Sequence, residues 1–296
     1  LDQRRPLDRG RVDRHLVGAI VEAEGRLVAG AYAARHREGD VDHFGDTPDP
    51  GGIEATPLGA GGDVVEYQLV GAFFAAESDR ERTKELGRRL ERVTEWLKSG
   101  GDAPADLLEQ QAEIRSRVPA FHWMIEFPEV FYAERPDPLD GGKRNGAAWM
   151  DAFVGNPPFL SGTDISGNLG EAYRDWVLSL HEGSHGKADL CIHFFRLAAT
   201  LIGEHGTFGF IATNSVSEGE SRLSGLKFLI DKDLAIYGAE NSLRWPGPAA
   251  VFVSTVQLAK GRPKNRILYC ECDGRRVGFI NSRLRPRPER QAPGML

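Results

Sequence analysis

Apolar positions follow a helical period in the first half of the chain and occur in strand-like runs in the second half. In residues 63–97 apolar side chains recur every three or four positions among charged ones, which predicts a long helical region. A Glu-Ser-Asp sequence at 77–79 is expected to break it in two. Residues 104–118 show the same period and begin with proline, so we expect another helix there. These segments predict a helical insertion at 63–120.

Residues 1–62 are poorly patterned. A helix interrupted by two glycines is possible at 17–34, and 39–62 is rich in Gly, Asp and Pro, as in a loop or disordered connection. Gly59-Ala60-Gly61-Gly62 looks like a cofactor loop, but no apolar strand precedes it, as such a loop requires.

The second half alternates predicted strands with predicted helices, which indicates an α/β domain. A Gly/Ser/Asp-rich stretch at 161–170 suggests a mobile lid or DNA-contacting loop. A hairpin is expected across Asp273-Gly274 from 266–270 and 277–280. The other expected strands are 148–154, 207–213, 234–238 and 251–258, and the expected helices are 169–181, 188–204 and 223–230.

The first of these strands ends abruptly at Gly155-Asn156-Pro157-Pro158-Phe159. Two consecutive prolines cannot donate to a ladder, so the strand must stop there. In open α/β sheets, ligands bind beyond the carboxyl ends of strands. Asn156 offers an amide acceptor and donor, Pro157 a carbonyl acceptor, and Phe159 a flat face for stacking. This set suits a planar substrate with an exocyclic NH2 group, such as adenine. The alternative is a rigid turn that only closes the strand.

Asn-Pro-Pro-Phe resembles motif IV of methyltransferases that act on amino groups, chiefly N6-adenine DNA methyltransferases. A second stretch is similar to the sequence that precedes this motif in large restriction-type, type IIG-like or phage-defence enzymes. It reads Phe121-His122-Trp123-Met124-Ile125-Glu126-Phe127-Pro128-Glu129-Val130-Phe131. His122 could be catalytic, but with no visible partner a structural role is favoured. The resemblance covers 118–261.

This resemblance implies a partial Rossmann-like class I sheet, with the helical insertion N-terminal to its central strand and 121–261 as the C-terminal half of the catalytic domain. It implies S-adenosylmethionine as cofactor and double-stranded DNA as partner. The catalytic residues would be Asn156, Pro157, Pro158 and Phe159. Ser161, and Trp245 in a Trp-Pro-Gly turn, would contact substrate.

One part of the family pattern is missing. Motif I, the Asp/Gly-rich strand–turn–helix that holds the cofactor, is not found upstream of Asn156. The cofactor-binding residues therefore cannot be placed. The sequence begins with Leu1 rather than Met, and we expect it to be an internal piece of a larger enzyme, unable to bind the cofactor alone.

The charge distribution and the cysteines bear on possible DNA contacts, zinc binding and the cellular compartment. The net charge of the 296 residues is −6, but 260–296 holds ten Lys/Arg and three Asp/Glu, so the preceding residues carry −13. We interpret 262–296 as the start of a truncated target-recognition region. It either contacts phosphates or is a solvated tail.

Cys191 lies in an apolar helix pattern, and Cys270-x-Cys272 has no second pair for zinc. No secretory signal or membrane-length apolar run is visible, which fits a reducing cytoplasm.

Two other functions compete with adenine methylation. Enzymes that methylate a protein glutamine amide or an RNA exocyclic amine share the Asn-Pro-Pro-aromatic motif, but they lack the aromatic approach and the long insertion. A non-catalytic DNA-binding or scaffolding remnant would keep the fold without the cofactor. Titration with S-adenosylmethionine discriminates the remnant from an enzyme.

Overall fold

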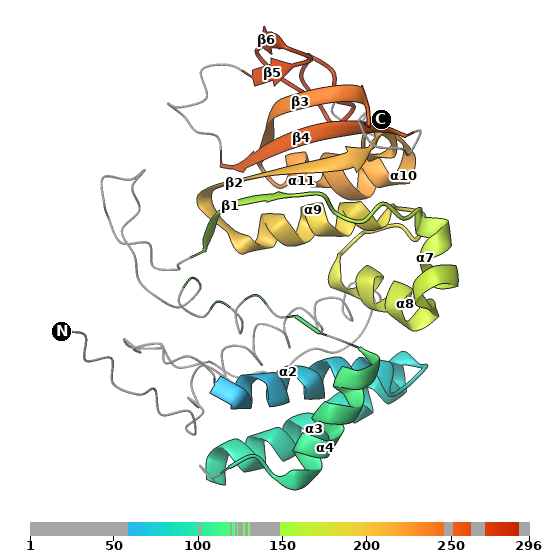
Figure 1. Ribbon diagram of the computed structural model, residues 1–296, viewed down its shortest axis with the longest axis vertical. Coiled ribbons are helices and arrows are strands. Elements are labelled where there is room, and N and C mark those ends of the chain that lie inside the picture. Colours follow the sequence, from blue (N-terminus) through green and yellow to red (C-terminus); the bar gives the residue numbers. More distant parts are fainter. Residues whose placement is uncertain are drawn as a thin grey trace, which may run out of the picture. The chain divides into compact units, whose positions relative to one another are not determined.

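The computed structural model describes residues 59–99, 102–118, 120, 121, 123, 127, 130, 149–245, 251–261 and 270–289. The chain divides into two compact units, Leu1–Arg135 and Pro136–Leu296 (Figure 1). The expectations for 1–58, for most of the aromatic stretch 121–131 and for 246–250 lie outside the described residues.

The described residues of the first unit include the helices α2 (Gly59–Phe74), α3 (Asp79–Ser99) and α4 (Ala105–Arg117). The predicted break at 77–79 is confirmed, and its cause is a capping box. The Ser78 hydroxyl donates to the Glu81 carboxylate over 2.7 Å, and the Glu81 N–H donates back to Ser78 Oγ over 3.4 Å. The start of α2 differs from expectation, because the helix already includes Gly59 to Gly62, which we had assigned to a loop.

A buried polar network fixes how the three helices pack. Gln68 of α2, 1% exposed, donates to the Leu107 carbonyl of α4 and accepts from Arg89 of α3. The Arg89 guanidinium also donates to Glu85 over 2.7 Å. Hydrogen bonds from Arg88 and then Arg89 lower the pKa of Glu85 to about 2, against the effect of its burial. The surrounding apolar core is formed by Val64, Val65, Leu69, Val93, Trp96 and Leu107.

The second unit contains a mixed six-stranded sheet with the order β1-β2-β4-β3-β5-β6. β1 is parallel to β2, whereas β4 runs antiparallel to both β2 and β3. β5 is parallel to β3 and forms a hairpin with β6. The strands are Met150–Gly155, Ile202–Thr213, Leu234–Arg244, Phe252–Lys260, Cys270–Cys272 and Arg275–Val277.

This arrangement confirms the expected fold class. β1, β2 and β3 point the same way, so their carboxyl ends share one edge of the sheet. The predicted hairpin is also found, with its turn at Asp273-Gly274, and its described strands lie closer to the turn than expected.

Helices on one face of the sheet close its core. α9 (Leu190–Leu201) follows the loop after α8 (Glu171–Leu180), and α10 (Gly219–Arg222), a π-helical turn (Leu223–Lys227) and α11 (Phe228–Asp231) connect β2 to β3. Figure 1 shows α9 and α11 along the same face. Phe195 and Ile192 of α9 are fully buried there with Phe208, Val256 and Leu258 of the sheet. Cys191 belongs to this core, as predicted.

One expected loop is a helix. Residues Gly162–Leu169 form α7, where the Gly/Ser/Asp content had indicated a mobile lid or DNA-contacting loop. Ile165 is 2% exposed and anchors the helix, so a single buried apolar side chain outweighs an otherwise loop-like composition.

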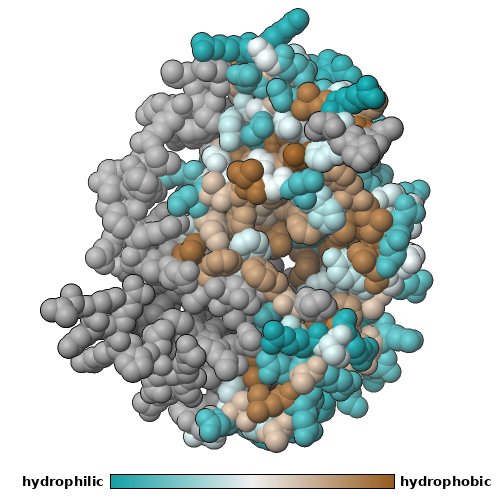
Figure 2. All heavy atoms as spheres, in the orientation of Figure 1, coloured by the Kyte–Doolittle hydropathy of each residue, from teal (hydrophilic) through white to brown (hydrophobic). Residues whose placement is uncertain are grey.

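β1 is an edge strand in the part of the sheet that is described. Its only described neighbour is β2, and Val154 near its end is 92% exposed. Figure 2 shows apolar surface in the region of β1 and α9, while the β5–β6 end is mostly hydrophilic. An apolar strand with a free edge favours pairing with a further strand. No described helix is long and apolar enough to cross a bilayer.

Candidate active site at the end of strand β1

The Asn-Pro-Pro-Phe turn leaves β1 at the sheet's carboxyl edge, as predicted. Pro157 is buried and anchors the turn, whereas Asn156, Pro158 and Phe159 are exposed. Phe159 is 37% exposed, so part of its ring faces solvent. Asn156 makes no hydrogen bond to any residue that the structure describes, and its amide is available to a ligand.

The second asparagine at this edge is in a different situation. Asn214 follows β2, and its side-chain oxygen accepts from Ser254 of β4 over 3.0 Å. Its side-chain nitrogen donates to Ser242 of β3 over 3.0 Å. Both polar ends of Asn214 therefore join strands, which leaves Asn156 as the better candidate for contacting substrate.

The turn is fixed to the start of α9. The Leu190 N–H donates to the Leu160 carbonyl over 2.9 Å, directly after Phe159. Gly162 lies so close to the chain before α9 that a Cβ on it would be 2.4 Å from the Lys187 carbonyl carbon. Ser161 is the N-cap of α7, and its hydroxyl shares a 3.0 Å hydrogen bond with Thr163 rather than capping the helix.

Asp189 connects the turn to the end of β2, a role that the sequence did not reveal. Its carboxylate accepts a hydrogen bond from Ser215, and its N–H donates to Ser221 over 3.0 Å. Ser215 is also within 2.6 Å of the Thr213 hydroxyl. The only signal in the sequence is an aspartate before an apolar helix, and that pattern predicts an ordinary cap instead.

Trp245 follows β3 at the same edge, and its backbone N–H donates to the Val251 carbonyl over 3.0 Å. It does not join the Asn156 turn directly. The sheet order places β3 three strands from β1, which is roughly 14 Å at a ~4.8 Å spacing. No hydrogen bond or ring contact links Trp245 to Asn156, Phe159 or Ser161 within the described parts of the chain.

Covalent catalysis and metal binding find no support among the described residues near the turn. Burial raises the pKa of the Cys191 thiol to about 12, so that it stays protonated and unreactive. Cys270 and Cys272 are free thiols in β5. No group of three His, Cys, Asp or Glu side chains in the described ranges could hold a metal ion.

The described residues also do not form a site for S-adenosylmethionine. Such a site needs a glycine turn after a strand, and β1 is the first strand that is described. The Gly59–Gly62 stretch lies at the start of helix α2, and the residues before it lie outside the described ranges.

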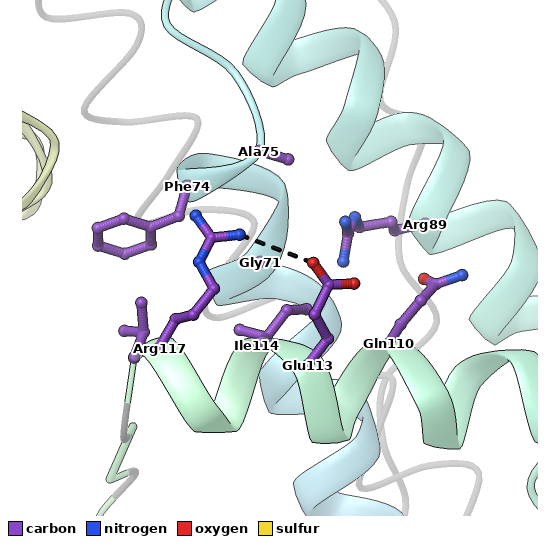
Figure 3. Close-up of a pocket in the computed structure, with 9 residues that line it drawn as sticks. Gly71, Phe74, Ala75, Arg89, Gln110, Glu113, Ile114 and Arg117 are labelled. Atoms are coloured by element: carbon purple, nitrogen blue, oxygen red, sulfur yellow. Dashed lines mark ion pairs between the residues drawn. The ribbon is translucent and has the colours of Figure 1, made fainter.

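The helical unit contains a small pocket of about 80 Å³, which Figure 3 shows. Its charged groups already have partners within the protein. Glu113 and Arg117 form an ion pair at 3.7 Å, and Arg89 is bonded to Gln68 and Glu85. Gln110 is the one lining side chain with an amide that has no partner among the described residues, so the pocket offers little to recognise a ligand and the site at the end of β1 is the better candidate.

Comparison with known proteins identifies a family for this chain. The model of the Eco57I restriction-modification methylase family matches residues 65–236, which include the helical unit, the Asn-Pro-Pro-Phe turn and β2. No curated protein matches the chain.

Two solved structures show weak likeness. One is the type IIL restriction-modification enzyme MmeI in complex with DNA, with 16% identity, 75% of this chain and 34% of that chain covered, and a TM-score of 0.35. The other is a putative class I S-adenosylmethionine-dependent methyltransferase from Listeria monocytogenes, with 10% identity, coverage of 72% and 64%, and a TM-score of 0.30. The chain thus spans about a third of the length of MmeI. Because the family match covers more than half of its residues, the chain belongs to the Eco57I restriction-modification methylase family.

Proposed function

We propose that this chain carries the base-binding half of the active site of an N6-adenine DNA methyltransferase, part of a cytoplasmic restriction-modification or phage-defence enzyme. The observation that carries the proposal is the exposed Asn156 amide, without a partner among described residues, beside the buried Pro157 and the exposed Phe159 ring. The family membership supports methyl transfer, and the choice of adenine N6 rests on the chemistry of the turn.

The reaction must overcome the poor nucleophilicity of the adenine amine, because its lone pair is delocalised into the ring. Asn156 Oδ1 and the Pro157 carbonyl would each accept one N–H of the amine. Two acceptors held in fixed positions make the nitrogen more tetrahedral and localise its lone pair. The buried Pro157 ring and the Leu190–Leu160 hydrogen bond hold the acceptors in place before the substrate arrives.

Phe159 would stack on the base after it leaves the duplex. Trp245, three strands along the same edge, would contact the flipped nucleotide from the other side, and Ser161 lies directly after the turn. S-adenosylmethionine would supply an electrophilic methyl group on a sulfonium. The described residues do not include its binding turn.

The test is Asn156→Ala in the complete enzyme that carries this chain. We expect methyl transfer to duplex DNA to fall ~10²-fold, or roughly 3 kcal/mol, with thermal stability nearly unchanged. Asn168→Ala is the matched control, since Asn168 is an exposed asparagine whose amide only donates to the Asp164 carbonyl within α7. A severe loss of stability with normal turnover per folded molecule would show that the turn is structural.

Substrate choice separates the remaining alternatives. If the enzyme methylates a glutamine-containing peptide or RNA but not DNA, the same turn binds the planar amine of that other substrate. A non-catalytic remnant is the second candidate, and the free edge of β1 is the observation that favours it. Complete absence of methyl transfer from the full enzyme would support that candidate.

A further inference from the structure

The segment after β6 presents three arginines on an ordered loop. We define the arginine loop as residues 281–289. Arg283, Arg285 and Arg287 are exposed, whereas Leu284 between the first two is 2% exposed. The loop also contains one acidic residue, Glu289.

The loop is fixed from within and from β3. The side-chain oxygen of Asn281 accepts from the backbone N–H groups of Arg283 and Arg285 over 3.0 and 3.1 Å. Leu284 adopts a φ of 51°, and its carbonyl accepts from the Asn241 side chain of β3 over 3.1 Å. These bonds hold the backbone from which the arginines project.

A second attachment comes from the helix that follows β2. Arg222, at the end of α10, donates to Ser282 Oγ over 2.8 Å. The Ser282 N–H in turn donates to Glu289 over 2.6 Å, so the acidic group of the loop is already engaged. Both attachment points, Arg222 and Asn241, lie toward the carboxyl edge of the sheet. The arginine loop therefore lies at the edge from which the Asn156 turn emerges.

The side chains of Arg283, Arg285 and Arg287 form no hydrogen bond or ion pair with residues that the structure describes. Guanidinium groups without internal partners are well suited to bind phosphate oxygens, often in a bidentate manner. The residues before 260 carry a balance of −13, so this cluster is a local exception on an acidic chain.

The spacing across the sheet fits a duplex whose target base reaches Asn156. β5, next to the loop, is four strands from β1, which is about 19 Å at a ~4.8 Å spacing. At ~3.4 Å of axis rise per base pair, that distance corresponds to about six base pairs. Phosphates about half a helical turn from the flipped base would lie near the arginines.

We propose that the arginine loop binds the phosphate backbone of duplex DNA beside the target adenine, and thereby orients the duplex on the carboxyl edge of the sheet. The identity of the partner as DNA rests on the proposed function. An acidic protein is the competing partner, but its binding would not require the arginines to share an edge with Asn156.

The experiment is a fluorescence-anisotropy titration of a labelled duplex with the full chain over a range of salt concentrations. The variant R283Q/R285Q/R287Q should bind at least about tenfold more weakly, and the slope of log K against log salt should shrink by about 0.9 for each lost phosphate contact. R283K/R285K/R287K keeps the charge and should keep most of the slope.

The matched control removes the same charge from the helical unit, as R88Q/R92Q/R117Q. These arginines are already paired with Glu85, Asp106 and Glu113, so duplex binding should change little. Equal binding and equal salt slopes for the two triple glutamine variants would overturn the proposal. So would a wild-type chain that binds an acidic protein but no duplex.

The result is separable from the proposed function. Asn156→Ala should leave duplex binding intact while methyl transfer is lost. Loop-dependent binding without any methyl transfer would refute only the proposed function. Normal methyl transfer and normal binding by R283Q/R285Q/R287Q would refute only the role of the loop.

Discussion

Gly162 and Lys187 approach each other so closely that a Cβ on Gly162 would lie 2.4 Å from the Lys187 carbonyl carbon and 2.5 Å from the Ala188 carbonyl oxygen. Backbone atoms cannot move aside as the end of a flexible side chain can. This contact fixes the chain just after the Asn-Pro-Pro-Phe turn against the segment that leads into α9.

We therefore expect Gly162→Ala to destabilise the protein by about 1–3 kcal/mol, because the added methyl group overpacks a backbone contact. In the complete enzyme it should also slow methyl transfer, since the turn must shift. Gly167→Ala in the same helix is the control. A Cβ there meets nothing within 4 Å, and alanine should be neutral or stabilising by up to about 1 kcal/mol. Denaturant unfolding of both variants checks this, and equal stabilities would contradict it.

Phe159 gives the second prediction. Its ring is 37% exposed, so we expect it to stack on the base rather than to complete the core. Phe159→Tyr and Phe159→Trp should retain methyl transfer, because each keeps a flat π-face. Phe159→Ala should lose about 1–3 kcal/mol of stacking, or roughly 5- to 150-fold in activity. A methylation assay on duplex DNA measures the effect, and unchanged activity of the alanine variant would exclude this role.

The position of the candidate site was easier to predict from the sequence than the hydrogen bonds that hold it in place. The position of Asn156 followed from local rules, since an apolar run must stop at two prolines. The role of Asp189 did not, because its partner Ser215 is 26 residues away in the sequence and reaches it only when α9 folds back along β2. Local rules likewise do not reveal that the Asn214 side chain joins strands, because its partners Ser242 and Ser254 are distant in sequence.

The errors in secondary structure have a similar origin. Gly162–Leu169 has a loop-like composition, yet it is helical, packs against α8 and buries Ile165. β3 extends to Arg244, beyond the predicted 234–238, because Glu240, Leu243 and Arg244 still pair with β4 despite the low strand propensity of the glutamate.

The third prediction concerns pH. The rings of His181 and His193 stack with their centroids 5.1 Å apart, and neither ring nitrogen of His193 has a hydrogen-bond partner. Burial, with the positive charge of Arg196 nearby, lowers the pKa of His193 to about 4. Burial followed by the charges of His193 and Arg196 lowers the pKa of His181 to about 3.

Because the unfolded chain protonates near pH ~6.5, it binds more protons than the folded state between that pH and the lowered values. The stability is therefore complete above about pH 6.5 and declines as the pH falls, by up to about 1.4 kcal/mol per pH unit for each histidine. Urea unfolding over this range measures the slope. His193→Phe keeps a stacked ring without a titrating group and should have a shallower slope; equal slopes would contradict the prediction.

The last prediction concerns the cofactor. We expect the isolated chain not to bind S-adenosylmethionine measurably, although it contains the Asn156 turn. The cofactor's methionine part requires a glycine turn after a strand, and no such sequence precedes Asn156. Within the described sheet, β1 has a neighbour on one side only and Val154 is 92% exposed, so the side where the cofactor-binding strands would pair is open. An open apolar edge also favours self-association. Calorimetric titration with S-adenosylmethionine, with size-exclusion chromatography of the same sample, tests both expectations. A monomer with micromolar affinity would contradict them and would place the cofactor site within these 296 residues.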